Sequence, residues 1–232
     1  MGTTLTDKVA LVTGGGTGIG KAAALEMARA GIKLVITGRR KERLDEVVAA
    51  IAAEGGTALA FAADVANEDD AAASVNAAIE AYGHLDILVN AAGVNEAGGI
   101  ATLSLEKWRR VLDINLWGTI CSTKAAVPHL MQAGGGDIIN ISSTTGRRAA
   151  GAFASYSTSK FGVNGFSESI RQELGKDNIR VTVIEPGATA TEIASSLSDD
   201  GWAKAINDHV TKDGAMEASD IAETILFILQ LP

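Results

Sequence analysis

Apolar and polar positions follow two alternating patterns along the chain. Short runs rich in β-branched residues predict strands, and they span residues 8–12, 33–37, 58–62, 86–89, 137–141 and 180–184. Longer stretches with helical spacing of apolar residues lie between them, at 19–30, 42–54, 69–82, 155–174 and 219–230. Strands that alternate with helices favour a parallel sheet covered on both faces. The predicted fold class is therefore α/β, with a doubly wound parallel sheet.

Composition supports one folded domain over residues 1–232. Hydrophobic residues make up 47% of the chain and charged residues 21%, which excludes disorder as the dominant state. No internal repeat or linker divides it. The net charge of −8 argues against a nucleic-acid partner, and no apolar run is long enough for a membrane helix. One cysteine, Cys121, suits a reducing compartment, so a cytoplasmic location is expected, and with three histidines it leaves no metal site.

Glycines gather where the predicted strands end. Gly14 to Gly16 follow the first strand, Gly38 the second, Gly93 the fourth and Gly187 the sixth. In an open parallel sheet, ligands bind beyond the carboxyl ends of the strands. The tight turns of the chain are therefore expected to surround a ligand site.

The first of these turns has the features of a phosphate-binding loop. Residues 13–20, TGGGTGIG, join the first predicted strand to the first predicted helix. Glycines let the backbone approach a ligand closely, and a helix that begins near Gly18 offers N–H groups and a positive dipole end to a pyrophosphate. The pattern predicts dinucleotide binding, and the absence of GxxxxGK[ST] argues against an ATPase loop.

The end of the second strand indicates which dinucleotide is bound. Gly38 stands where NAD-binding folds place a carboxylate, and Arg39, Arg40 and Lys41 follow it. A guanidinium can hold a 2′-phosphate, whereas a carboxylate would repel it. NADP(H) is therefore the predicted cofactor, with NAD(H) possible. The alternative is that these cations form only the solvated start of a helix.

Four polar residues form a candidate catalytic group. Tyr156 and Lys160 lie four residues apart on a predicted helix, so that the ammonium would lower the pKa of the phenol and make it a proton donor and acceptor. Ser143 ends the preceding strand and would face the same crevice. Asn115 is a polar residue in an apolar helical stretch, where its side chain needs hydrogen-bond partners. A water molecule that links Asn115 to Lys160, and so orders the lysine, is one way to supply them.

Together these motifs resemble the short-chain dehydrogenase/reductase family over essentially the whole chain, with its Rossmann fold. Asn115, Ser143, Tyr156 and Lys160 match the catalytic tetrad in order and spacing. The resemblance implies that Ser143 and Tyr156 hydrogen-bond a carbonyl oxygen, Tyr156 donates the proton, Lys160 holds the nicotinamide ribose and Asn115 supports a water relay. The cofactor-binding residues that it implies are Gly14, Thr17, Gly18, Ile19, Gly20, Arg39, Asp64, Val65, Asn90, Ala91, Gly93, Tyr156, Lys160, Pro186, Gly187, Thr189 and Thr191.

The predicted activity is hydride transfer between NADP(H) and a small carbonyl compound or secondary alcohol. Residues 188–214 are interpreted as a substrate lid, with an ungated helical hairpin as the alternative. Arg147 and Arg148 could pair with a substrate carboxylate or remain solvated. A weaker resemblance, to dehydrogenases of small hydroxy acids and hydroxy amino acids, lies in the end of this segment and in residues 218–223.

Two rival functions follow from other features of the sequence. Ser157 to Lys160 form an S-x-x-K string, as in serine acyl transferases, but the K-T-G partner motif is absent. A non-catalytic NADP-binding sensor is the alternative function. Such a protein is expected to lack a tetrad member, and all four are present.

The resemblance also implies self-association. Residues 112–131 and 156–174 would form the two long helices that pack against a second copy, giving a homodimer or homotetramer. The family pattern has one more strand after residues 219–230, and this sequence contains none. We expect the chain to continue beyond Pro232, the alternative being a protein that ends early.

Overall fold

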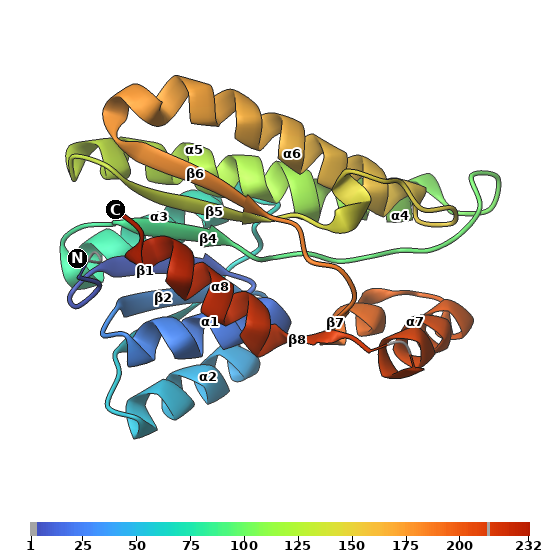
Figure 1. Cartoon of the computed structure of the whole chain (residues 1–232), viewed down its shortest axis with the longest axis horizontal. Helices are drawn as coiled ribbons and strands as arrows, with labels where there is room; N and C mark the ends of the chain where they lie inside the picture. Colours follow the sequence, from blue (N-terminus) through green and yellow to red (C-terminus); the bar gives the residue numbers. More distant parts are fainter. Residues whose placement is uncertain (1–3, 213) are drawn as a thin grey trace.

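The computed structural model describes residues 4–212 and 214–232 and is built on one six-stranded parallel sheet (Figure 1). The spatial order is β3-β2-β1-β4-β5-β6, so the chain runs outward from β1 to one edge and then from β4 to the other. This is the doubly wound arrangement predicted from the sequence. The strands are β1 (Val9–Thr13), β2 (Lys33–Gly38), β3 (Ala58–Ala62), β4 (Ile87–Asn90), β5 (Gly136–Ile141) and β6 (Ile179–Ile184).

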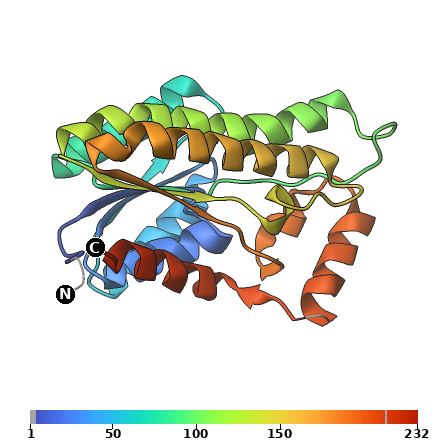
Figure 2. The ribbon, with the colours of Figure 1, turned by 45° about the horizontal axis from the view of Figure 1, so that its top comes forward.

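Helices cover both faces of this sheet, as Figures 1 and 2 show. One face packs against α1 (Gly18–Arg29), α2 (Lys41–Ala53) and α8 (Ala218–Gln230). The opposite face packs against α3 (Glu68–Tyr82), α5 (Gly118–Gln132) and α6 (Ala154–Leu174).

Alternation along each inner strand supplies the two cores. In β1, Ala10 and Val12 point to the α1 side, whereas Val9 and Leu11 point to the α3 side. Both sets are fully buried, as expected for a parallel strand inside a sheet. The expectation of two buried faces fails at the two edge strands, since β3 leaves Leu59 exposed and β6 leaves Arg180, Thr182 and Val183 half-buried.

The remaining elements extend beyond the carboxyl ends of the strands. Helix α4 (Leu105–Leu112) leads through a π-helical turn, η1 (Asp113–Trp117), directly into α5. Residues 188–214 start in β7 (Thr189–Ala190), continue through a 3₁₀ turn, η4 (Glu192–Ser196), and end in α7 (Asp200–Lys212). A two-residue strand, β8 (Met216–Glu217), pairs with β7 and brings the chain back to α8 (Figure 2).

Candidate active site

A cavity of about 820 Å³ lies at the carboxyl ends of the strands, between the loops that follow them and residues 188–196. Its volume is within the range of small-molecule and cofactor sites. Three predicted site residues, Gly20, Asn90 and Asn115, do not line it. The predicted residues that do are Gly14, Thr17, Gly18, Ile19, Arg39, Asp64, Val65, Ala91, Gly93, Ser143, Tyr156, Lys160, Pro186, Gly187, Thr189 and Thr191.

The loop after β1 presents the start of α1 to this cavity. Thr17 occupies the N-cap position, but its side chain makes no capping hydrogen bond, and the first turn holds no acidic residue. The N–H groups of this turn are thus available to an anion. Gly20 has a packing role instead, because a Cβ there would lie 2.3 Å from the carbonyl oxygen of Gly14.

Arginines line the cavity at the end of β2. Arg39, Arg40 and Arg43 all reach it, and Arg43 pairs with Glu46 on α2 at 3.2 Å. Arg40 forms an ion pair with Glu192 of η4 at 3.5 Å, so it bridges to the segment that precedes α7. Within residues 4–212 and 214–232, Arg39 has no ion pair and remains available to a phosphate.

Tyr156 and Lys160 share one face of α6, as their spacing predicts. The Lys160 Nζ atom lies 5.6 Å from the centre of the Tyr156 ring and donates a hydrogen bond to the Ile141 carbonyl oxygen at 2.8 Å. Lys160 is only 4% exposed, so its ammonium is held in place at the end of β5. The phenol and the ammonium both line the cavity.

Burial dominates the proton affinities of this pair. It raises the pKa of Tyr156 to about 12, while a side-chain hydrogen bond with Ser143 acts in the lowering direction. Burial also lowers the pKa of Lys160 to about 8. The expectation of a lowered pKa for Tyr156 is therefore wrong for this structure, because the effect of burial is larger than any lowering by neighbouring groups.

Ser143 is the serine whose side chain acts to lower the pKa of Tyr156. Its Oγ atom also accepts hydrogen bonds from the backbone N–H of Thr145 at 3.2 Å and from the Thr145 hydroxyl at 3.0 Å. The neighbouring Ser142 hydroxyl instead donates to the Lys160 carbonyl oxygen at 3.3 Å. This difference agrees with the choice of Ser143 over Ser142 as the candidate catalytic residue.

Asn115 is a positioning residue in this structure. Its carboxamide accepts from the Val94 N–H at 2.8 Å and donates to the Val94 carbonyl at 2.9 Å and to the Ser159 hydroxyl at 3.0 Å. The side chain is satisfied by these bonds, so the expected water link to Lys160 is not what satisfies it. Sequence reasoning missed Ser159, which no local signal marks as a partner of Asn115.

Asn90 stabilises the centre of the sheet. Its Nδ2 atom donates to Asn140 at 2.8 Å and to Thr123 at 3.1 Å, and Asn140 donates in turn to Ser167 at 2.8 Å. This buried network ties β4 and β5 to α5 and α6, just behind the cavity. Asn90 therefore supports the site without lining it.

Two further sequence hypotheses lose their geometric basis. Arg147 pairs with Glu185 at 2.7 Å, and neither Arg147 nor Arg148 is among the cavity-lining residues. Arg110 of α4, which sequence reasoning did not single out, lines the cavity instead. Ser157, the serine of the S-x-x-K string, is buried outside the cavity, where its hydroxyl accepts from the N–H of Ala150 at 3.4 Å.

The arrangement fits a nicotinamide dinucleotide. Arg39, an uncapped helix start and a hydroxyl–phenol–ammonium group lie in this order along a single cavity, because they follow β2, β1 and β5. Gly93, near the middle, is close to both Lys160 and Asn115, since a Cβ there would lie 3.9 Å from the lysine Nζ and 3.7 Å from the asparagine Oδ1. None of the described helices is long and apolar enough to cross a membrane.

Comparisons with known proteins agree with this geometry. Residues 8–202 match the family model of the short chain dehydrogenases. The chain is 36% identical over 231 residues to a 3-oxoacyl-[acyl-carrier-protein] reductase of Synechocystis sp., covering 99% of this chain and 92% of that protein. A metagenomic short-chain oxidoreductase in complex with NADP superimposes with a TM-score of 0.84 at 31% identity, covering 99% of this chain and 93% of that one. A dehydrogenase from Burkholderia phymatum in complex with NAD gives 0.91 at 26% identity, covering 97% and 87%.

Proposed function

The chain belongs to the short-chain dehydrogenase family of NAD(P)-dependent oxidoreductases, and we propose that it transfers a hydride between NADP(H) and a small carbonyl compound or secondary alcohol. The observation that carries this proposal is the convergence of Ser143, Tyr156 and Lys160 at one end of a cavity whose other end holds an uncapped helix start and arginines.

The residues at the end of β5 supply the proton chemistry. Ser143 and Tyr156 donate hydrogen bonds to the substrate carbonyl oxygen and stabilise the negative charge that develops there. A bound nicotinamide in its reduced form supplies the hydride to the carbonyl carbon. Tyr156, whose pKa of about 12 keeps it protonated at neutral pH, then gives its proton to the oxygen, which as an alkoxide is a stronger base than a phenolate. In oxidation these steps reverse.

Lys160 and Asn115 keep the proton donor in position. With a pKa of about 8, Lys160 is mainly charged at neutral pH, and its ammonium lies close enough to stabilise the phenolate formed by proton donation. It also faces the cavity, where it would hold the nicotinamide ribose. Asn115 fixes the loop after β4 and, through Ser159, the first turns of α6.

We propose that residues 188–214 act as a lid over this cavity. The lid contacts the core at separate points: Glu192 pairs with Arg40, and the Trp202 ring packs edge-on against Phe153 with centroids 5.6 Å apart. The start of η4 also adjoins the phosphate loop, since a Cβ at Gly18 would lie 3.3 Å from the Thr191 Cβ. Closure over bound substrate would exclude water from the reaction.

The experiment that tests this function is a panel of ketones, aldehydes and secondary alcohols, followed at the absorbance of reduced nicotinamide with both cofactors. We expect turnover with at least one substrate class and a higher kcat/KM for NADP(H) than for NAD(H). Tight NADPH binding without turnover of any substrate would instead indicate a sensor protein.

We also propose a cytoplasmic location for the protein. Cys121 is buried and forms no disulfide, which is compatible with a reducing compartment.

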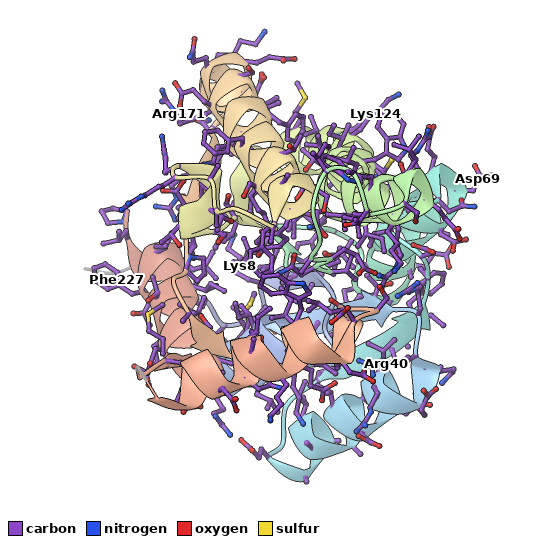
Figure 3. All side chains as sticks on the ribbon, turned by 90° about the vertical axis from the view of Figure 1, so that its right-hand side faces the viewer. Lys8, Arg40, Asp69, Lys124, Arg171 and Phe227 are labelled. Atoms are coloured by element: carbon purple, nitrogen blue, oxygen red, sulfur yellow. The ribbon has the colours of Figure 1, made fainter. Side chains whose placement is uncertain are left out.

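We further propose that the protein forms at least a homodimer through α5 and α6. Large apolar side chains are exposed along this pair and the turn before it, where Trp117 is 43%, Met131 45% and Phe161 45% exposed. Phe227 on α8, 62% exposed, points outward on a separate surface (Figure 3) and could support a tetramer. Burial of such side chains against a second copy removes apolar area from water.

Light scattering tests this assembly directly. The wild-type protein is expected to have the mass of a dimer or a tetramer, and Trp117→Glu is expected to lower it because the carboxylate would be buried unpaired. Phe227→Glu is the matched control and should leave the dimer intact. A wild-type monomer at micromolar concentration with full activity would exclude the α5–α6 interface.

A further inference from the structure

One carboxamide in the cavity has no partner in the protein. Asn95, two residues after Gly93, is 7% exposed and lines the cavity. In the described part of the chain its Oδ1 atom has no hydrogen-bond partner, and its Nδ2 atom donates no hydrogen bond. Because an unsatisfied buried amide is destabilising, the free donor and the free acceptor of Asn95 are available to a ligand in the cavity.

The backbone holds this carboxamide firmly. Asn115 binds both backbone polar groups of the preceding residue, Val94. Ser196 of η4 binds the N–H of Asn95 itself, which donates to the Ser196 hydroxyl at 2.8 Å, while the proton of that hydroxyl is directed to the Ile193 carbonyl at 2.7 Å. With the main chain fixed on both sides, the backbone of Asn95 cannot shift to bring its carboxamide to another partner.

Arg110 lies next to this position. Its Nη1 atom donates to the carbonyl oxygen of Ser196 at 3.2 Å, so one residue contacts both Arg110 and Asn95. The same Nη1 pairs with Glu96 at 2.9 Å. Among the described residues, the Nε and Nη2 groups of Arg110 make no hydrogen bond, and the side chain lines the cavity.

The charges around Arg110 determine what it can bind. Glu96 is 2% exposed, and its second oxygen accepts from the Ser198 N–H at 3.2 Å and hydroxyl at 2.8 Å. The Arg110–Glu96 pair therefore has no net charge, and both carboxylate oxygens of Glu96 already accept hydrogen bonds within the protein. A ligand would be attracted by directed N–H donors and not by net charge.

We propose that Asn95 and Arg110 form a subsite that binds the carboxylate of the substrate, while Ser143 and Tyr156 bind its reacting oxygen. A guanidinium presents two parallel N–H groups that match the two oxygens of a carboxylate, and the Nδ2 group of Asn95 adds a third donor. The Oδ1 atom of Asn95 is an acceptor that a carboxylate cannot satisfy, and it is left to a water molecule. The other arginines of the cavity, Arg39, Arg40 and Arg43, lie at the end of β2, away from Tyr156. This subsite rests on the proposed function, and it narrows the expected substrates of the enzyme to oxo acids and hydroxy acids.

Three ligands of similar size test the subsite: 3-hydroxybutanoate, its methyl ester and 2-pentanol. Their dissociation constants from the enzyme–NADP⁺ complex are measured by calorimetry, together with kcat/KM for oxidation. The wild-type enzyme is expected to bind 3-hydroxybutanoate most tightly. Asn95→Leu, of nearly equal size, should weaken its binding about 10- to 100-fold and change 2-pentanol binding little.

Arg110→Lys is the second variant, because it keeps Glu96 paired and removes only the fork of N–H groups. It should also weaken binding of the carboxylate selectively. Arg147→Lys is the matched control, since Arg147 pairs with Glu185 outside the cavity, and it should bind all three ligands as the wild type does.

The binding measurements test the carboxylate subsite, whereas the turnover measurements test the proposed hydride transfer. Selective loss of carboxylate binding in both variants supports the subsite even where no ligand is oxidised, and the absence of oxidation then counts against the proposed reaction. Equal affinity of the wild type for all three ligands, no measurable binding of any, or equal loss across the ligands in Asn95→Leu would overturn the subsite.

Discussion

Replacement of Tyr156 by phenylalanine is expected to lower kcat by at least about 100-fold, the usual contribution of a positioned general acid. The variant keeps the ring that packs against the Val65 and Val111 cluster and removes only the hydroxyl. The developing alkoxide would then have Ser143 as its remaining donor at this end of the cavity. Steady-state kinetics on any substrate that the wild-type enzyme reduces measures the loss.

Tyr82→Phe is the matched control, because Tyr82 is the other of the two tyrosines in the chain. Its hydroxyl donates to the Leu34 carbonyl at 3.2 Å on the α3 side of the sheet, outside the cavity. Its loss should reduce stability by about 1 kcal/mol and leave kcat unchanged. NADPH binding should be retained in both variants. Near-normal turnover in Tyr156→Phe would exclude Tyr156 as the proton donor.

Arg39→Asp is expected to reverse the cofactor preference. In the wild type, the guanidinium offers charge-assisted hydrogen bonds to the 2′-phosphate of NADPH, and the aspartate would repel that phosphate but accept from the ribose hydroxyl of NADH. The ratio of kcat/KM for NADPH over NADH should fall by about 100-fold or more, on the scale of hydrogen bonds to charged groups. Kinetics with each cofactor gives this ratio.

Lys41→Asp makes the same change of charge two residues away and serves as the control. Lys41 pairs with Asp45 on α2 and does not line the cavity, so the ratio should change little. An equal fall in both variants would show that the overall field, and not a contact of Arg39, sets the preference. A wild-type enzyme that already prefers NADH would contradict the assignment of Arg39.

The sequence predicts the sheet well because inner parallel strands have a strong pattern. The four inner strands contain apolar runs that are largely buried on both faces, and their predicted and observed ends differ by no more than one residue. β3 and β6 have the same kind of sequence, but their places at the two edges of the sheet depend on the order of the strands, which local patterns do not encode. The two-residue strands β7 and β8 carry no detectable signal.

Some features of the candidate active site can likewise be predicted from the sequence, and others cannot. Tyr156 and Lys160 are predictable because they lie on one helix at a spacing that fixes their relation. The pKa values of these two side chains cannot be predicted from their spacing, because burial by elements distant in the sequence outweighs the interaction within the pair. Asn95 and Arg110 are linked through Glu96, which pairs with Arg110, and through Ser196, which contacts both residues from about a hundred residues further along the chain. Contacts of that kind leave no periodic or motif-level trace in the sequence.

Transfer of deuterium from the cofactor tests the central claim most directly. NADPH labelled with deuterium at the reactive face of nicotinamide C4 is incubated with the enzyme and a ketone that it reduces, and the alcohol is examined by mass spectrometry and NMR. The proposed reaction predicts one deuterium on the carbinol carbon and none when labelled water replaces labelled cofactor. An alcohol whose carbinol hydrogen comes from water, with no label from NADPH labelled on either face, would contradict it.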